Sequence, residues 1–108
     1  AESVGKLVDI VRRSDAGTGG GAPGVLVICP SVITETGELV EMFRDGRKTS
    51  LGFRAEFTRM CGGREVPLLF ADDVAQVSPI DGVHFSPDAQ KAIGRMVASG
   101  VRELVFCR

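Results

Sequence analysis

The sequence lacks the features that mark membrane-spanning and nucleic-acid-binding proteins. Its longest continuous apolar run is Val25–Cys29, whereas about 18 apolar residues are needed to span a bilayer. The first residues show no basic-then-apolar pattern of a secretory signal. The 13 basic and 14 acidic residues give a formal net charge of -1, which provides no basic surface for nucleic acid or an anionic membrane. We therefore expect neither partner.

Cysteine and phosphate-binding patterns are equally sparse. The three cysteines, Cys29, Cys61 and Cys107, are odd in number and widely spaced, so they fit neither a disulfide framework nor a zinc knuckle. Their apolar surroundings favour reduced, buried thiols, which in turn favour a cytoplasmic location. The glycines of Asp15–Pro23 lack the spacing of a phosphate-binding turn and indicate a flexible loop. We expect no cofactor and no bound metal.

What the sequence does contain is an α/β pattern in one small domain of 108 residues. The runs Val25–Cys29 and Val66–Ala71 are apolar, as in strands covered on both faces of a parallel sheet. Between them the spacing predicts a weak helical stretch around Glu38–Arg44. A better helix follows from Thr49 or Ser50 to Cys61, stopped by Gly62-Gly63. Two strands flanking a helix predict a βαβ crossover.

Helices are also predicted at both ends of the chain. Residues 2–14 carry apolar side chains at helical spacing, with no convincing N-cap before them. The last helix is clearer, because Ser86 fits an N-cap, Pro87 the first helical position and Asp88 a favourable early acid. A sheet of two parallel strands leaves open apolar edges. The abrupt first helix and the small sheet together predict that the chain is part of a larger α/β unit.

Candidate catalytic side chains lie between the second strand and the last helix. His84 is the single histidine of the chain and follows Asp81 by three residues. Reactive groups of parallel α/β sheets gather beyond the carboxyl ends of the strands, which is where this segment lies. The spacing lets the Asp81 carboxylate accept a hydrogen bond from imidazole Nδ1–H, leaving Nε2 as a general base. Gly82 removes a side chain where the turn would be crowded.

The segment Asp81-Gly82-Val83-His84-Phe85-Ser86 resembles the final Asp-x-x-His block of the SGNH or GDSL-type hydrolases. The order and spacing of the other segments resemble the C-terminal half of the arylesterase and acyltransferase branch of that family. The resemblance implies a flavodoxin-like three-layer α/β/α fold with a parallel sheet, of which residues 1–108 form the C-terminal portion. It also implies ester hydrolysis through an acyl-serine, without a metal, with His84 as the base and Asp81 orienting it.

The departures from the family pattern are specific. No Gly-Asp-Ser nucleophile motif is present, and the sequence contains no asparagine for the family's Gly-x-Asn-Asp motif. We therefore expect an N-terminal piece of the same hydrolase to be the partner that supplies the serine, the oxyanion donors and further strands. A small ester is the expected substrate, and transfer of the acyl group to another alcohol is a further option. The oligomeric state stays open, a homo-oligomer included.

Three alternatives remain at this stage. The pair Asp81 and His84 could only shape a turn, in which case the chain would be a non-enzymatic α/β interaction or scaffold module. Asp72 and Asp73 could be metal ligands, although such pairs at strand ends more often terminate the strand. The loop Ser31–Asp45 carries more apolar side chains than a solvated loop needs, which fits core packing, an acyl pocket or a subunit contact.

Overall fold

In the computed structural model, which describes residues 1–106, helices and strands alternate as the sequence pattern predicts. The elements are α1 (Glu2–Arg12), β1 (Val27–Cys29), α2 (Gly46–Leu51), α3 (Phe53–Arg64), β2 (Leu68–Phe70) and α4 (Pro87–Phe106). Short 3-10 turns occupy Thr18–Gly20, Gly37–Leu39 and Ala71–Asp73. No helix among these described residues is both long and apolar enough to cross a bilayer.

The two strands pair in parallel, which confirms the predicted crossover. Val27 lies opposite Leu68, and Cys29 lies opposite Phe70. Each strand is shorter than its apolar run: β1 covers only the last three residues of the first run, and β2 the interior of the second. Pro67 has no N–H to donate, so it takes part through its carbonyl, which accepts the Val27 N–H at 3.0 Å.

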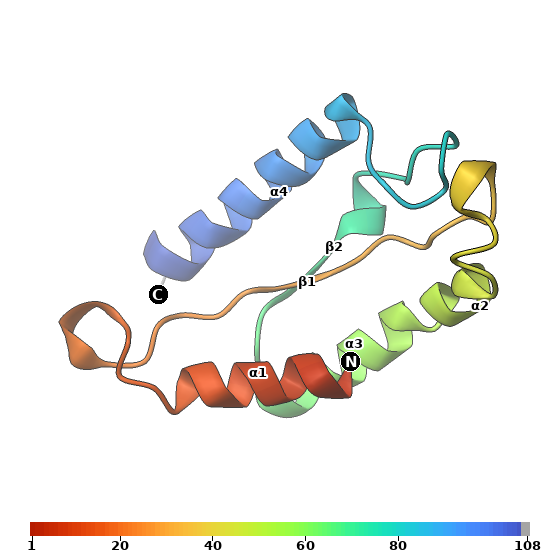
Figure 1. Ribbon diagram of the computed structural model, residues 1–108. Helices are drawn as coiled ribbons and strands as arrows, with labels where there is room; N and C mark the ends of the chain where they lie inside the picture. The colour runs from red at the N-terminus through yellow and green to blue at the C-terminus, as the bar shows by residue number, and fades with distance from the viewer. Residues whose placement is uncertain (107–108) are drawn as a thin grey trace.

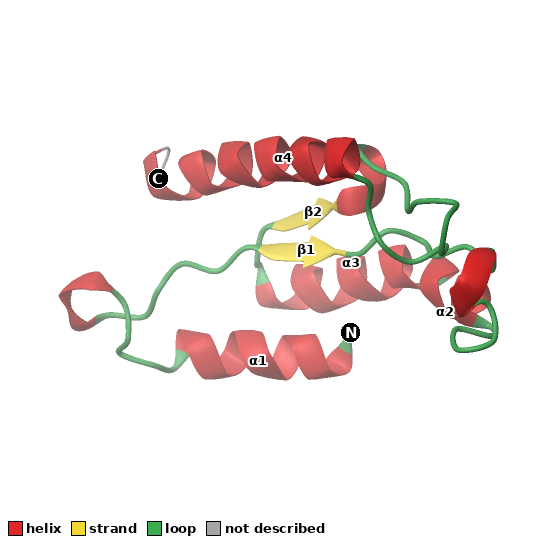
Figure 2. Ribbon diagram, turned by 45° about the horizontal axis from the view of Figure 1, so that its top comes forward, coloured by secondary structure: helices red, strands yellow, loops and turns green. Residues whose placement is uncertain are grey.

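The helices cover the strands from both sides. Figure 1 shows α4 on one side of β1 and β2, with α1 and α3 on the other, and Figure 2 shows the strands between these layers. α3 packs against both strands, α1 packs against α3, and α4 lies against β2. α4 approaches closely at Gly100, where a Cβ would lie 2.9 Å from Leu69 Cδ1. The predicted fold class, a three-layer α/β arrangement on a parallel sheet, is confirmed.

The core lies between α1, α3 and the facing side of the sheet. Its buried side chains are Val8, Val27, Cys29, Phe57, Met60, Cys61 and Val66. The thiols of Cys29 and Cys61 are free and buried, and burial raises the pKa of both above the ordinary value. Cys107, the third predicted thiol, lies outside the described residues.

Three predictions about the middle of the chain are wrong in detail. The single helix predicted from Thr49 or Ser50 is divided at Gly52 into α2 and α3. Gly62 and Gly63 do not stop the helix, because α3 continues to Arg64 and ends where Glu65 takes a left-handed conformation with φ of 51°. Arg64 Nε and Nη2 donate to the Asp9 carboxylate of α1 at 3.0 and 3.1 Å, a tertiary contact that holds the last turn despite the glycines. The stretch Glu38–Arg44 forms a 3-10 turn and further turns in place of a helix.

Candidate active site

Asp81 and His84 lie in the connection between β2 and α4, beyond the carboxyl end of the parallel sheet. The start of α4 anchors this connection two residues after His84. Ser86 is its N-cap, as predicted, because Ser86 Oγ accepts the Ala89 N–H at 3.2 Å and Pro87 is the first helical residue. The dyad, by which we mean Asp81 and His84, is therefore held on its C-terminal side by a capped helix.

The carboxylate of Asp81 serves the turn and the imidazole at the same time. Its Oδ2 lies 2.6 Å from His84 Nδ1, and its Oδ1 accepts the backbone N–H groups of Val83 and His84, each at 2.9 Å. The Asp81 side chain is 23% exposed, whereas the imidazole is 73% exposed. With Nδ1 bonded to Asp81, Nε2 is the ring nitrogen left for exchanging a proton with a substrate or nucleophile.

These hydrogen bonds keep Asp81 ionised. The backbone N–H of His84, then that of Val83, then the His84 side chain lower the pKa of Asp81 from 3.8 to about 2. A carboxylate that stays charged at neutral pH favours the Nδ1–H tautomer of its histidine partner. It also stabilises the imidazolium that forms when Nε2 accepts a proton. The dyad therefore has the polarity that a general base requires.

The lowered pKa predicts a loss of stability in acid. A carboxyl group whose pKa is lower in the folded than in the unfolded chain stabilises the fold at any pH above its unfolded-state pKa. For Asp81 this stabilisation is lost as the pH falls from about 4 to about 2. We expect the free energy of unfolding of the wild type to approach that of Asp81→Asn over this interval in urea titrations. A difference between the two proteins that stays constant with pH would contradict the prediction.

Backbone contacts fix the conformation of the turn. The Ser78 N–H donates to the His84 carbonyl at 2.7 Å, and the Gly82 N–H donates to the Ser78 carbonyl at 2.8 Å. Gly82 has a φ of +76°, and a Cβ there would lie 2.0 Å from the carbonyl oxygen of Thr34, in the loop that follows β1. Glycine is required at this position on both grounds. The close approach of Thr34 could not be seen in the sequence, because no local pattern connects residues so far apart in the chain.

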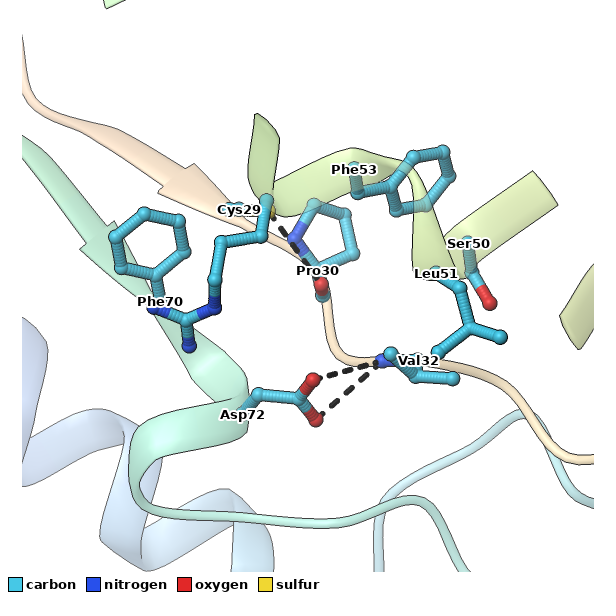
Figure 3. Close-up of a pocket in the computed structure, with 9 residues that line it drawn as sticks. Cys29, Pro30, Val32, Ser50, Leu51, Phe53, Phe70 and Asp72 are labelled. Atoms are coloured by element: carbon cyan, nitrogen blue, oxygen red, sulfur yellow. Dashed lines mark hydrogen bonds between the residues drawn. The ribbon is translucent and has the colours of Figure 1, made fainter. Parts of the chain in front are cut away.

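A small cavity lies beside the carboxyl ends of the strands. It measures about 120 Å³ and is lined by Cys29, Pro30, Val32, Ser50, Leu51, Phe53, Arg54, Phe70 and Asp72. Figure 3 shows the Asp72 carboxylate facing the backbone of Val32. The Val32 N–H donates to Asp72 Oδ1 at 3.3 Å and to Oδ2 at 3.4 Å. Asp73 accepts from Arg54 at 2.7 Å, and the Arg54 guanidinium lies 3.8 Å from the Phe70 ring centroid. Both carboxylates therefore have structural contacts.

No group of three His, Cys, Asp or Glu residues that could hold a metal ion occurs within residues 1–106. The apolar loop Ser31–Asp45 divides into two parts. Its side chains Val32, Ile33, Leu39 and Phe43 are half-buried, whereas Met42 is 75% exposed and Val40 is also exposed. Core packing thus accounts for the first group only.

Several solved structures with the same fold are named as esterases. The chain aligns with the aryl esterase of M. smegmatis with a TM-score of 0.87 and 25% identity, over 96% of this chain and 50% of that one. Est24, a carbohydrate acetylesterase from Sinorhizobium meliloti, aligns with a TM-score of 0.87 and 27% identity, over 95% and 50%. Another carbohydrate acetylesterase family member from that organism gives 0.85 and 26%, over 96% and 50%. No family model and no curated protein matches the sequence.

The chain therefore has the fold of half an α/β ester hydrolase. Within that class, its neighbours are arylesterases and carbohydrate acetylesterases, and they confirm the resemblance to the SGNH or GDSL-type family that the sequence indicates. The chain spans about half the length of each of these esterases. The catalytic assignment of Asp81 and His84 stays a prediction, now with a defined geometry.

Proposed function

We propose that this chain supplies the acid-base dyad of a serine esterase whose nucleophile lies on another segment. The observation that carries the proposal is the hydrogen bond of 2.6 Å between His84 Nδ1 and Asp81 Oδ2, with the imidazole exposed beyond the carboxyl end of a parallel sheet. The segment that bears the serine and the oxyanion donors belongs to the same polypeptide or to a second one. We call this chain together with that segment the active assembly.

The proposed chemistry follows from the two roles of the dyad. His84 Nε2 takes the proton of the serine hydroxyl as the serine oxygen attacks the ester carbonyl, and the resulting imidazolium gives that proton to the departing alkoxide. Water then attacks the acyl-serine with the same assistance and releases the acid. An alcohol in place of water would give acyl transfer. Asp81 stays ionised throughout, because its pKa of about 2 keeps it charged beside the imidazolium.

The open edge of β1 is the proposed contact site for the remaining strands. The Val27 N–H points toward β2, so the backbone groups of Ile28 point to the opposite edge, since alternate residues of a strand face opposite sides. α1 and α3 lie in the same layer (Figure 2). A right-handed crossover through α1 would then place a preceding parallel strand beside β1. The end of that strand would meet the same sheet edge as the dyad.

The exposed surface also favours an additional packing partner. The accessible surface is 7226 Å², whereas a compact folded chain of this mass exposes about 5,800 Å². The radius of gyration is 15.6 Å, against about 13 Å for a compact domain of this length. An excess of about 1,400 Å² is comparable to one side of a permanent interface. Exposed apolar side chains on α1, β1 and α4 contribute to it, namely Leu7, Ile10, Ile28, Val101 and Val105.

The proposal predicts activity for the active assembly and none for the isolated chain. A suitable substrate is p-nitrophenyl acetate, because it is both an aryl and an acetyl ester, the two classes that the structural neighbours are named for. We expect the assembly to hydrolyse this ester with saturation kinetics. We also expect a fluorophosphonate to label the serine-bearing segment, as detected by mass spectrometry. The isolated chain should show negligible hydrolysis. It should also self-associate through its open strand edge in analytical ultracentrifugation.

Two results would contradict the proposal that the dyad and the serine lie on separate segments. Ester hydrolysis by the isolated chain would show that no second segment is needed. A monomeric isolated chain that unfolds cooperatively would show that the edge of β1 needs no partner. In contrast, hydrolysis that appears only when both segments are present supports the proposal.

A further inference from the structure

We propose that the loop Thr34–Gly37, which follows β1, is a positioning element for the dyad, and that Gly37 is its critical residue. The inference rests on the proposed function for its kinetic consequences. Its structural basis is independent of that function. The dyad follows β2 in the chain, whereas this loop follows β1, more than forty residues earlier. Both strands therefore determine where the imidazole lies.

Two hydrogen bonds join the loop to the turn that carries Asp81, and a third lies within the loop. The Thr34 N–H donates to the Gly82 carbonyl at 2.8 Å. The Thr36 hydroxyl donates to the Pro79 carbonyl at 3.3 Å. The two threonine hydroxyls lie 3.2 Å apart and bond to each other. The loop is therefore hydrogen-bonded to the turn on both sides of Asp81, at Pro79 and at Gly82.

Gly37 makes the closest approach. A Cβ at this position would lie 1.9 Å from the carbonyl oxygen of Ile80, 2.7 Å from its carbonyl carbon and 2.9 Å from Asp81 Cα. These are backbone atoms, so a side chain could be accommodated only by moving the peptide that precedes Asp81. Since the Asp81 carboxylate orients the His84 ring through the hydrogen bond to Nδ1, such a displacement would turn the imidazole away from its working direction.

The segment Ser31–Ile33, which leads into the loop, is held by two buried hydroxyls and a carboxylate. Ser31 Oγ donates to the Ala75 carbonyl at 3.0 Å, and Ser50 Oγ accepts the Ile33 N–H at 3.0 Å. Both serines are buried. The Val32 N–H donates to Asp72. These contacts connect the segment before the loop to α2 and to the residues that follow β2, so displacing the loop would strain buried and part-buried hydrogen bonds.

The test compares Gly37→Ala with Gly19→Ala in the active assembly. Both glycines are left-handed, with φ of +75° and +81°, so alanine introduces similar backbone strain at each. No atom lies within 4 Å of a Cβ at Gly19, whereas one at Gly37 meets the Ile80 peptide. We expect Gly37→Ala to lower kcat about 100-fold with KM changed less than about twofold, because a misplacement of about 1 Å can cost that much. Gly19→Ala should retain wild-type kcat.

Two further readouts separate positioning from general destabilisation. When Gly37→Ala is added to Asp81→Asn, we expect a further decrease in kcat of less than about threefold. The hydrogen bond from Asp81 to His84, through which Gly37 acts, is already lost in Asp81→Asn. In proton NMR of the assembly, the deshielded Nδ1 proton of His84 should shift or disappear in Gly37→Ala and persist in Gly19→Ala. The NMR readout needs no ester hydrolysis, so it tests the inference even if the assembly does not hydrolyse esters.

Thr36→Val provides a milder variant if Gly37→Ala does not fold. It removes the hydroxyl that bonds to Pro79 and keeps the shape of the side chain. We expect it to lower kcat about two- to fivefold and to shift the His84 Nδ1 proton resonance, with the melting temperature almost unchanged. A wild-type kcat together with an unshifted resonance, in Gly37→Ala or in Thr36→Val, would overturn the inference. The inference would also be overturned if the decrease in kcat of the double variant equalled the product of the decreases in Gly37→Ala and Asp81→Asn.

Discussion

Replacing His84 with alanine should lower kcat for ester hydrolysis by the active assembly about 10⁴- to 10⁶-fold, the range seen when a catalytic triad loses its base. The physical reason is that the variant removes the base that accepts the serine proton, and His84 is the single histidine that this chain can supply. KM should change much less than kcat, because the imidazole acts on the reacting serine. The measurement is steady-state kinetics with p-nitrophenyl acetate.

Stability provides the control for this variant. The His84 side chain is 73% exposed, and the Asp81 carboxylate would still accept two backbone N–H groups after its removal. Exposed substitutions usually change the free energy of unfolding by less than about 0.5 kcal/mol, so the melting temperature should be nearly that of the wild type. A folded His84→Ala assembly with a kcat within tenfold of the wild-type value would contradict the assignment of His84 as the catalytic base.

The second large effect is expected at Asp81, where two substitutions separate its two roles. Asn at this position keeps an oxygen that can accept the N–H groups of Val83 and His84, so the turn should survive. It removes the charge and the acceptor that select the Nδ1–H tautomer. We expect Asp81→Asn to lower kcat about 10³- to 10⁴-fold, as loss of a triad carboxylate does, while the assembly stays folded.

Alanine at the same position should remove the turn contacts as well. We therefore expect Asp81→Ala to match Asp81→Asn in lost activity and to have a lower melting temperature at neutral pH. If Asp81 only shaped a turn, as in the non-enzymatic alternative, Asp81→Asn would keep most of the activity and Asp81→Ala alone would be impaired. Parallel kinetics and thermal unfolding of the two variants decide between these outcomes.

Predictions from the sequence succeeded where neighbouring residues decide the structure. The turn around Asp81 and the cap at Ser86 each involve hydrogen bonds over two or three residues, so spacing alone predicts them. The strands were located for a similar reason, because an apolar run ended by Pro30 has few other conformations in an α/β chain. Their observed bounds are shorter, since pairing extends only where both partners lie side by side.

The predictions failed where a distant residue outweighs a local preference. Gly62-Gly63 is a sound local signal for a helix end, yet the ion pair between Arg64 and Asp9 of α1 stabilises one more turn. The exposure of Met42 and the close approach of Gly37 to Ile80 depend likewise on how separate loops pack. None of these distances has a signature in the local pattern.

The sequence by itself therefore determined the α/β class, the resemblance to SGNH or GDSL-type hydrolases and the pairing of Asp81 with His84, because periodicity, capping and a three-residue spacing are local properties. Only the tertiary structure decided that the loop after β1 holds the turn after β2. It alone also showed that the edge of β1 is open in the described chain. The contact between the two loops depends on parallel pairing, which brings the ends of two strands together although the residues that meet there are far apart in sequence.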